Sequence, residues 1–192
     1  MAQTVAVAGV ILTAAALAVG VGQLVVALDS GDDTLQSKDH WMHCTVLNET
    51  QFDIVYDREY WDSGTYYQAP PQKIAKFSAG TFSVCKKTGF AGVSGGNSWK
   101  VILDDNTVFR FSLGYTDPVI GSRKSAAVDS NGNPQDGYDA AAERGCSGRS
   151  PIYEGKDEDG EVTYFIIDVT SVTGHHSKYT IQQSEIKGWK DR

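Results

Sequence analysis

Histidine is the side chain of this sequence best suited to metal binding, and its spacing argues against a metal site. The four histidines fall in two pairs, His40 with His43 and His175 with His176. A His-x-x-His pair can hold zinc on a helix, but His40 and His43 lie where a polar linker meets a predicted strand, without an acidic ligand at a known spacing. Adjacent histidines on a strand point to opposite faces, so His175 and His176 cannot easily share one ion. We therefore expect four solvated surface histidines and no metal.

The cysteines and the acidic turns also lack the pattern of a catalytic or metal site. Cys44, Cys85 and Cys146 form no Cys-x-x-Cys pair, and none lies in a recognisable nucleophile motif. Their number is compatible with one disulfide and a free thiol, or with full reduction, so it does not define a compartment. The stretches 129–133 and 157–161 resemble calcium loops but do not fit the EF-hand frame. We expect no enzyme activity and no cofactor.

The charge balance limits the classes of partner. The chain has 17 basic and 24 acidic residues and a formal net charge of −7. Nucleic-acid binding needs a basic face, and none is concentrated here. Net charge also disfavours attraction to anionic lipid, so membrane recognition should rest on headgroup shape and apolar insertion. One glycosylation sequon, Asn48-Glu49-Thr50, is a weak indication of a secretory route.

The elements that position any site begin with an apolar N-terminal segment. Residues 1–28 carry no charged side chain before Asp29. As a helix, Val5 to Leu28 would be about 36 Å long, enough to cross a bilayer core of about 30 Å. We predict a transmembrane or pore-type helix over 1–28. A secretory signal peptide and a single-pass anchor are the alternatives.

Small and polar residues recur in this segment every three or four positions, so one stripe of the helix would be small and the opposite stripe aliphatic. A helix of this kind is suited to assembly with copies of itself. The residues predicted to face a neighbouring helix or a pore are Gly9, Thr13, Ala16, Gly20 and Gln23. Those predicted to insert into lipid are Val10, Leu17, Val21 and Leu24.

The remaining sequence predicts a polar linker over 29–40 and a mainly β domain over 41–192. Apolar and polar residues alternate in 99–103 and in 107–113, and Asp104-Asp105-Asn106 supplies a turn, so this pair predicts a hairpin. Further strands are predicted at 41–47, 51–56, 73–77, 81–86, 163–170 and 178–183. One short helix is predicted at 138–144, and the glycine-rich 92–97 is predicted to be a wide turn. The fold class is an antiparallel β-sandwich with an N-terminal inserting or anchoring helix.

The order of these features, from about Leu47 to Val169, resembles the actinoporin-like pore-forming proteins, and more loosely the aegerolysins and fungal fruit-body lectins. The motifs that carry the resemblance are Tyr60-Trp61-Asp62-Ser63-Gly64-Thr65, Pro71-Gln72-Lys73-Ile74, the glycine-rich 89–96, and Phe109-Arg110-Phe111-Ser112-Leu113-Gly114-Tyr115. Gly114 stands where the family usually has proline, and the loop 116–124 lacks the family's aromatic residues. The family's sphingomyelin specificity is therefore not implied.

The resemblance implies a phosphocholine pocket that would carry over to Ser63, Ser112, Tyr115 and Tyr138. A quaternary ammonium favours aromatic faces, and a phosphate favours hydroxyl donors, so these residue types suit such a headgroup.

Together these features predict a secreted pore-forming protein that binds a target membrane, oligomerises and inserts its N-terminal helices. The expected partners are membrane lipid, with a choline headgroup as the candidate, and further copies of the chain. Two other classes remain open: a membrane-anchored β-sandwich lectin or adhesion module, which would bind a glycan, and a structural assembly subunit with a shared helical core.

Overall fold

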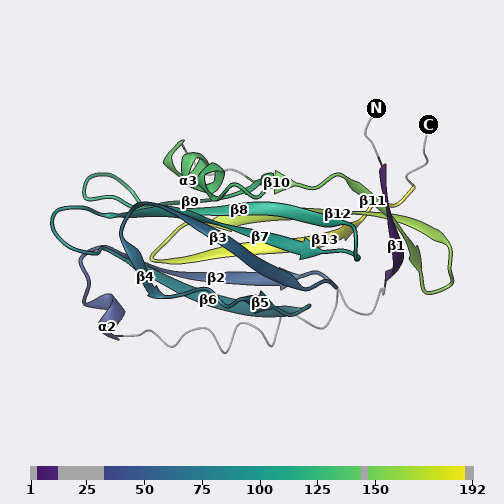
Figure 1. Cartoon of the computed structure of the whole chain (residues 1–192), viewed down its shortest axis with the longest axis horizontal. Helices are drawn as coiled ribbons and strands as arrows, with labels where there is room; N and C mark the ends of the chain where they lie inside the picture. Colours follow the sequence, from purple (N-terminus) through teal and green to yellow (C-terminus); the bar gives the residue numbers. More distant parts are fainter. Residues whose placement is uncertain (1–3, 13–32, 144–146, 189–192) are drawn as a thin grey trace.

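The computed structural model describes residues 4–12, 33–143 and 147–188, and these form a sandwich of two β-sheets (Figure 1). Sheet A, with eight strands, has the order β1 (Thr4–Leu12), β11 (Ile152–Asp157), β12 (Val162–Val172), β13 (His176–Glu185), β2 (Trp41–Glu49), β6 (Ser78–Cys85) and β4 (Thr65–Gln68), and β10 (Gly148–Arg149) pairs with β12. Sheet B, with five strands, has the order β5 (Lys73–Ile74), β3 (Ile54–Ser63), β7 (Val93–Ile102), β8 (Val108–Asp117) and β9 (Lys124–Asp129). All pairs are antiparallel except β1 with β11 and β13 with β2. The mainly β sandwich is as predicted.

The predicted hairpin is confirmed and is longer than its pattern indicated. Strands β7 and β8 pair from Val93 with Asp117 to Ile102 with Val108. The carboxylate of Asp104 closes the turn by accepting hydrogen bonds from the backbone N–H of Asn106 at 2.7 Å and of Thr107 at 2.6 Å. The inward-facing side chains of this hairpin fill the core between the sheets: Trp99, Val101, Phe109, Phe111 and Leu113.

The other predicted strands are found with shifted bounds, as β2, β3, β6, β12 and β13. The strand predicted at 73–77 is shorter, because β5 covers only Lys73–Ile74.

The glycine-rich stretch 92–97 is not a wide turn, and that prediction is wrong. Residues 93–97 form the first part of the central strand β7, where Gly96 pairs with Gly114 of β8. A Cβ on Gly96 would lie 2.2 Å from the carbonyl oxygen of Pro134, and one on Gly114 would lie 1.8 Å from that of Gly137. The glycines are needed because helix α3 (Pro134–Glu143) rests directly on the backbone of sheet B.

The short helix predicted at 138–144 exists as α3 but begins four residues earlier, at Pro134. Proline suits the first helical position because its missing N–H would have no partner there. Asn133 caps the helix: its Oδ1 accepts a hydrogen bond from the Gln135 N–H at 3.3 Å, and its Nδ2 donates to the Asp136 carboxylate at 2.6 Å. The predicted end at Arg144 lies outside the described residues.

The N-terminal helix prediction is wrong over residues 4–12, which form strand β1 alongside β11. Val5 and Val7 alternate with alanines, a period that suits a strand, and the pairing with β11 shifts around Gly9, whose φ is +73°. Val7 and Val10 are buried in the core, so Gly9 and Val10 belong to a strand and not to helix faces. The other residues assigned to that helix, Thr13, Ala16, Leu17, Gly20, Val21, Gln23 and Leu24, lie outside the described residues.

The predicted linker contains helix α2 (Asp33–Gln36), which docks on the outer face of sheet A. Leu35 is 1% exposed and packs against Trp41 and Cys85. Within residues 4–12, 33–143 and 147–188, no helix has the length and hydropathy needed to span a bilayer.

Candidate functional site

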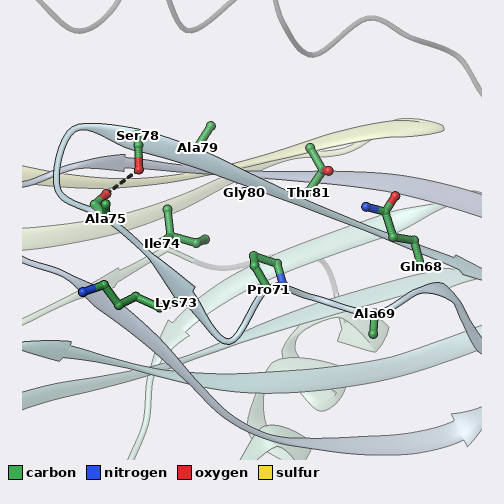
Figure 2. Close-up of a pocket in the computed structure, with 10 residues that line it drawn as sticks. All are labelled: Gln68, Ala69, Pro71, Lys73, Ile74, Ala75, Ser78, Ala79, Gly80 and Thr81. Carbon is green, nitrogen blue, oxygen red and sulfur yellow. Dashed lines mark hydrogen bonds between the residues drawn. The ribbon is translucent and has the colours of Figure 1, made fainter.

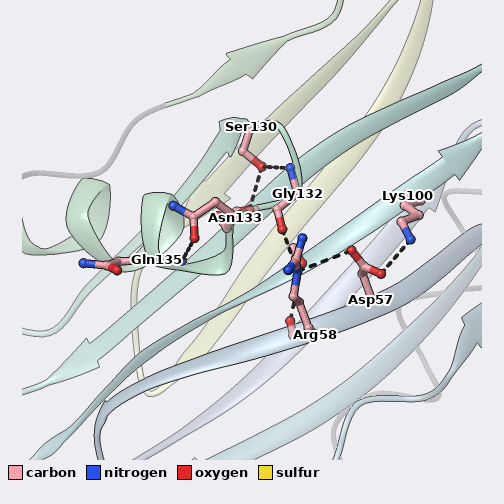
Figure 3. A network of polar contacts seen from close by, with 9 residues as sticks. Asp57, Arg58, Lys100, Ser130, Gly132, Asn133 and Gln135 are labelled. Carbon is pink, nitrogen blue, oxygen red and sulfur yellow. Dashed lines mark hydrogen bonds and ion pairs between the residues drawn. The ribbon is translucent and has the colours of Figure 1, made fainter.

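Ser112 and Tyr115 do not meet in one pocket, because they point to opposite faces of β8. Ser112 is fully buried under the turn between β9 and α3, where its Oγ donates to the carbonyl oxygen of Asn133 at 2.8 Å and lies 2.7 Å from the Oγ of Ser130. Figure 3 shows this turn, which is also held by Arg58, whose Nε donates to the Gly132 carbonyl at 3.0 Å. Ser112 therefore positions α3.

Tyr115 lies between the sheets and has no exposed surface. Its ring contacts those of Trp61 and Phe82, each with a centroid distance of 5.7 Å. Burial raises the pKa of the Tyr115 hydroxyl well above its ordinary value. The residue is part of the core and lines no surface pocket.

Ser63 and Tyr138 lie on or near the face of sheet B that carries α3. Ser63 ends β3 opposite Ser94, beside a corner at Gly64 with φ +93°. Tyr138 of α3 faces Tyr60 of β3 with ring centroids 5.4 Å apart. Partial burial and the neighbouring carboxylate of Asp62 raise the pKa of Tyr138.

We call Tyr60, Asp62 and Tyr138 the tyrosine pair site. An aromatic ring beside a carboxylate suits a quaternary ammonium group. Of the four predicted headgroup residues, Tyr138 belongs to this site and Ser63 follows Asp62 in sequence. The sequence does not single out Tyr60 and Asp62 within their motif, because their approach to α3 depends on how the helix packs.

A second feature lies at one end of the sandwich, where the loops 86–92 and 118–123 expose apolar side chains. The loops follow β6 and β8, at the end drawn on the left of Figure 1. They touch, because a Cβ on Gly92 would lie 2.3 Å from the carbonyl oxygen of Asp117. Their outermost side chains are apolar: Phe90 is 98% exposed, Ile120 91% and Val119 46%. We call these three residues the apolar tip.

Asp117 holds the root of the tip together. Its carboxylate is buried, accepts a hydrogen bond from the Trp41 N–H at 3.1 Å, and lies 3.2 Å from the Nε of Arg123 and 3.6 Å from the Nδ1 of His40. It thus joins the end of β8 to the start of β2 and to the loop 118–123. The two apolar loops are therefore mounted on a rigid base.

The four histidines gather at this same end, contrary to the prediction of solvated surface residues. His175 stacks on Trp41 with ring centroids 4.2 Å apart, and His176 meets the edge of the same ring at 5.5 Å. Parallel pairing of β13 with β2 places His176 opposite His43. Only His176 is exposed; the other three are half-buried. Sequence separation hides this cluster, since its members come from strands far apart in the chain.

Two open cavities on the surface lack the features of a binding site. One, of about 340 Å³, lies beside β5 and β6 (Figure 2), and its charged side chain, Lys73, is ion-paired with Asp53 at 2.6 Å. The other, of about 460 Å³, mixes Arg110 with Asp129 and Asp136. The aromatic residues of the second cavity, Phe109 and Tyr153, are buried in the core and offer no ring face to a ligand. Neither cavity has the features of a headgroup or sugar site.

The sequon and two of the cysteines have structural positions. Asn48 is 1% exposed, and its Nδ2 donates to the carbonyl oxygens of Phe52 at 2.7 Å and Ala75 at 2.9 Å, so the folded sequon is closed to glycosylation. Cys44 and Cys85 are buried free thiols, and burial raises the pKa of both. In the described part of the chain, no cluster of three or more His, Cys, Asp or Glu side chains is arranged to hold a metal ion.

Comparison with known proteins shows a resemblance at the level of the fold. No protein-family model matches the sequence, and no curated protein is significantly similar to it. Among solved structures, the chain is similar to the crystal structure of the lipid binding protein Nakanori, with 13% sequence identity and a TM-score of 0.49. The match covers 76% of this chain and 71% of that chain. At this identity the likeness concerns the arrangement of the strands alone.

Proposed function

We propose that this protein binds lipid bilayers by inserting its apolar tip. The observation that carries the proposal is the exposure of Phe90 at 98% and Ile120 at 91% on two touching loops. Single exposed apolar residues are ordinary on protein surfaces, but two large ones that are almost fully exposed on adjoining loops favour an interaction site. Moving two such side chains from water into the bilayer is worth roughly 3 to 6 kcal/mol, which suits reversible docking.

The charges around the tip favour a lipid surface. Lys38 and Lys87 are exposed and form no ion pair with any residue that the structure describes. Two carboxylates close to the tip are paired, Asp39 with Lys86 and Asp117 with Arg123. This end therefore presents apolar side chains beside two exposed lysines, Lys38 and Lys87.

The tyrosine pair site supports a choline headgroup as the lipid that is recognised. A tyrosine ring beside the Asp62 carboxylate suits a trimethylammonium group, and the headgroup phosphate would need hydroxyl donors nearby. Tyr138 and Ser63 belong to the pocket predicted from the sequence. Tyr60 and Asp62 take the place of Ser112 and Tyr115, which are buried in the scaffold.

Pore formation by several copies is the finer part of the proposal, and it requires β1 to leave the sandwich. The charge-free segment extends to Leu28, but β1 occupies residues 4–12 of it. As a helix, the remainder from Thr13 to Leu28 would be about 24 Å long, shorter than a bilayer core of about 30 Å. A full membrane span from this segment must therefore recruit residues of β1.

The docking proposal is tested by vesicle co-sedimentation of the double variant Phe90→Asp, Ile120→Asp. Insertion of two carboxylates into lipid is unfavourable, so binding should fall by at least about tenfold. The matched control is Ile102→Asp, Val162→Asp, which changes two exposed residues at the opposite end, 37% and 53% exposed. Equal binding by the tip variant and the wild type would reject the tip as the docking surface.

A further inference from the structure

We infer that acid pH strengthens docking of the tip on bilayers that contain anionic lipid, because His43, His175 and His176 become cationic around Trp41 at the root of the tip. We call these three residues the histidine trio. The inference rests on the proposed docking function and adds the lipid charge and the pH range in which it operates.

The histidine trio is a packed cluster. His175 is stacked on Trp41, and its Nδ1 lies 3.2 Å from the Trp41 carbonyl oxygen. His43 and His176 have ring centroids 5.8 Å apart, and the Nδ1 of His43 lies 3.1 Å from the Oγ of Ser83. The rings are close enough that protonation places up to three positive charges on one small area of sheet A.

The histidine trio lies at the base of the apolar tip. The His43 N–H donates to the carbonyl oxygen of His175 at 2.7 Å, which joins β2 to the loop before β13. The Lys86 N–H donates to the carbonyl oxygen of His40 at 3.0 Å, which joins the start of the loop 86–92 to the same segment. Charges at this position approach the headgroups when the tip inserts, and the screening length is about 8 to 10 Å at physiological salt.

Among the side chains that the structure describes, no ion pair joins the histidine trio to a carboxylate. Its nearest neighbours on sheet A are Ser83 and Cys85 of β6 and Lys178 of β13, and none of these is a carboxylate. Lys38, which follows α2, faces Cys85. The carboxylates of Asp39 and Asp117 are already paired with Lys86 and Arg123.

His40 differs from the histidine trio because it faces a carboxylate. Its Nδ1 lies 3.6 Å from the Asp117 Oδ2, so the charge it would gain is partly neutralised in place. This contrast makes His40 a control within the same end of the molecule.

The direction of titration agrees with this geometry. Burial, and then the nearby His176, lower the pKa of His43 from its ordinary value of 6.5. His43 therefore stays neutral at neutral pH in the folded protein and is protonated only in acid. Because the pKa of His43 is lower in the folded than in the unfolded protein, neutral His43 stabilises the fold above the unfolded-state pKa. This stabilisation is lost as the pH falls towards the folded-state pKa, so acid also loosens the contacts around Trp41.

The test measures vesicle binding at about pH 7.5 and about pH 5.5. It compares phosphatidylcholine vesicles with vesicles that also contain phosphatidylserine. For the wild type we expect affinity for the anionic vesicles to rise on the order of tenfold on acidification, with little change on phosphatidylcholine alone. The triple variant His43→Gln, His175→Gln, His176→Gln should lose this rise, and His40→Gln should keep it. If the triple variant does not fold, the exposed His176→Gln alone should reduce the rise.

The outcomes separate this inference from the docking proposal. Tip-dependent binding that is equal at both pH values, or an acid rise that survives the substitutions, overturns the inference and leaves docking intact. A wild-type protein that binds no vesicle at either pH overturns the docking proposal itself. Near-ultraviolet circular dichroism at both pH values identifies unfolding, and an acid rise that accompanies loss of this signal also overturns the inference.

Discussion

At the scale of single residues, buried polar groups are defined by partners that the sequence does not reveal. Asn48 is part of an apparent glycosylation sequon, yet its side chain joins the turn after β2 to the segment after β5 through the carbonyls of Phe52 and Ala75. Ser112 matches a family motif, yet its hydroxyl holds the turn before α3. In both cases the motif is present, and the tertiary contacts assign it to the scaffold.

Asn48→Asp should lower the free energy of unfolding by about 2 to 4 kcal/mol, because the carboxylate cannot donate to the buried carbonyls and places a charge beside them. Urea unfolding followed by tryptophan fluorescence measures this change. Asn106→Asp, in the exposed β7–β8 turn, is the control and should be nearly neutral. A similar small effect at both positions would mean that the Asn48 contacts contribute little.

At the scale of elements, the parts predicted well are those with one buried face. The β7–β8 hairpin and β12 are predicted from the alternation of apolar and polar residues, because every second residue of a strand with one buried face points into the core. Residues 93–97 of the central strand β7 are not predicted as a strand, because glycine is rare in strands. The glycines are needed there because α3 approaches the backbone. Strand β1 was missed because its apolar run continues far beyond the strand, and length alone indicated a helix.

Gly114→Ala should displace α3 and destabilise the protein by about 1 to 3 kcal/mol or more, because the new Cβ meets backbone atoms that cannot rotate away. A Cβ on Gly174 has its nearest neighbour at 3.5 Å, so Gly174→Ala is the matched control. Thermal unfolding compares the two variants. Equal melting temperatures would contradict the account of α3 resting on the sheet B backbone.

At the scale of the whole molecule, the apolar tip and β1 lie at opposite ends of the sandwich (Figure 1). Besides its pairing with β11, β1 is held by the Asp104 carboxylate, which accepts from the Ala8 N–H at 2.9 Å, and by Gln51, whose Nε2 donates to the Ile11 carbonyl at 3.0 Å. When the tip docks, β1 is at the end of the molecule far from the bilayer. The N-terminal segment can reach the bilayer only if β1 detaches from β11.

A reversible clamp on β1 tests that step. Ala6 lies opposite Glu154 in the pairing of β1 with β11, so Ala6→Cys, Glu154→Cys places two cysteines for a disulfide. If the chain forms pores as proposed, the oxidised variant should bind vesicles normally but release no trapped dye, and reduction should restore leakage to the wild-type rate. Leakage by the oxidised form would contradict the requirement that β1 leaves the sandwich.

The central claim is that the apolar tip enters the bilayer, and depth-dependent fluorescence tests it most directly. The variant Phe90→Cys, labelled with an environment-sensitive nitrobenzoxadiazole group, should show a blue shift and quenching by lipid-borne quenchers when vesicles are added. The same label at Val162→Cys, on the opposite end, should show neither change. A label at position 90 that keeps its aqueous spectrum while the protein is bound to vesicles would contradict the claim.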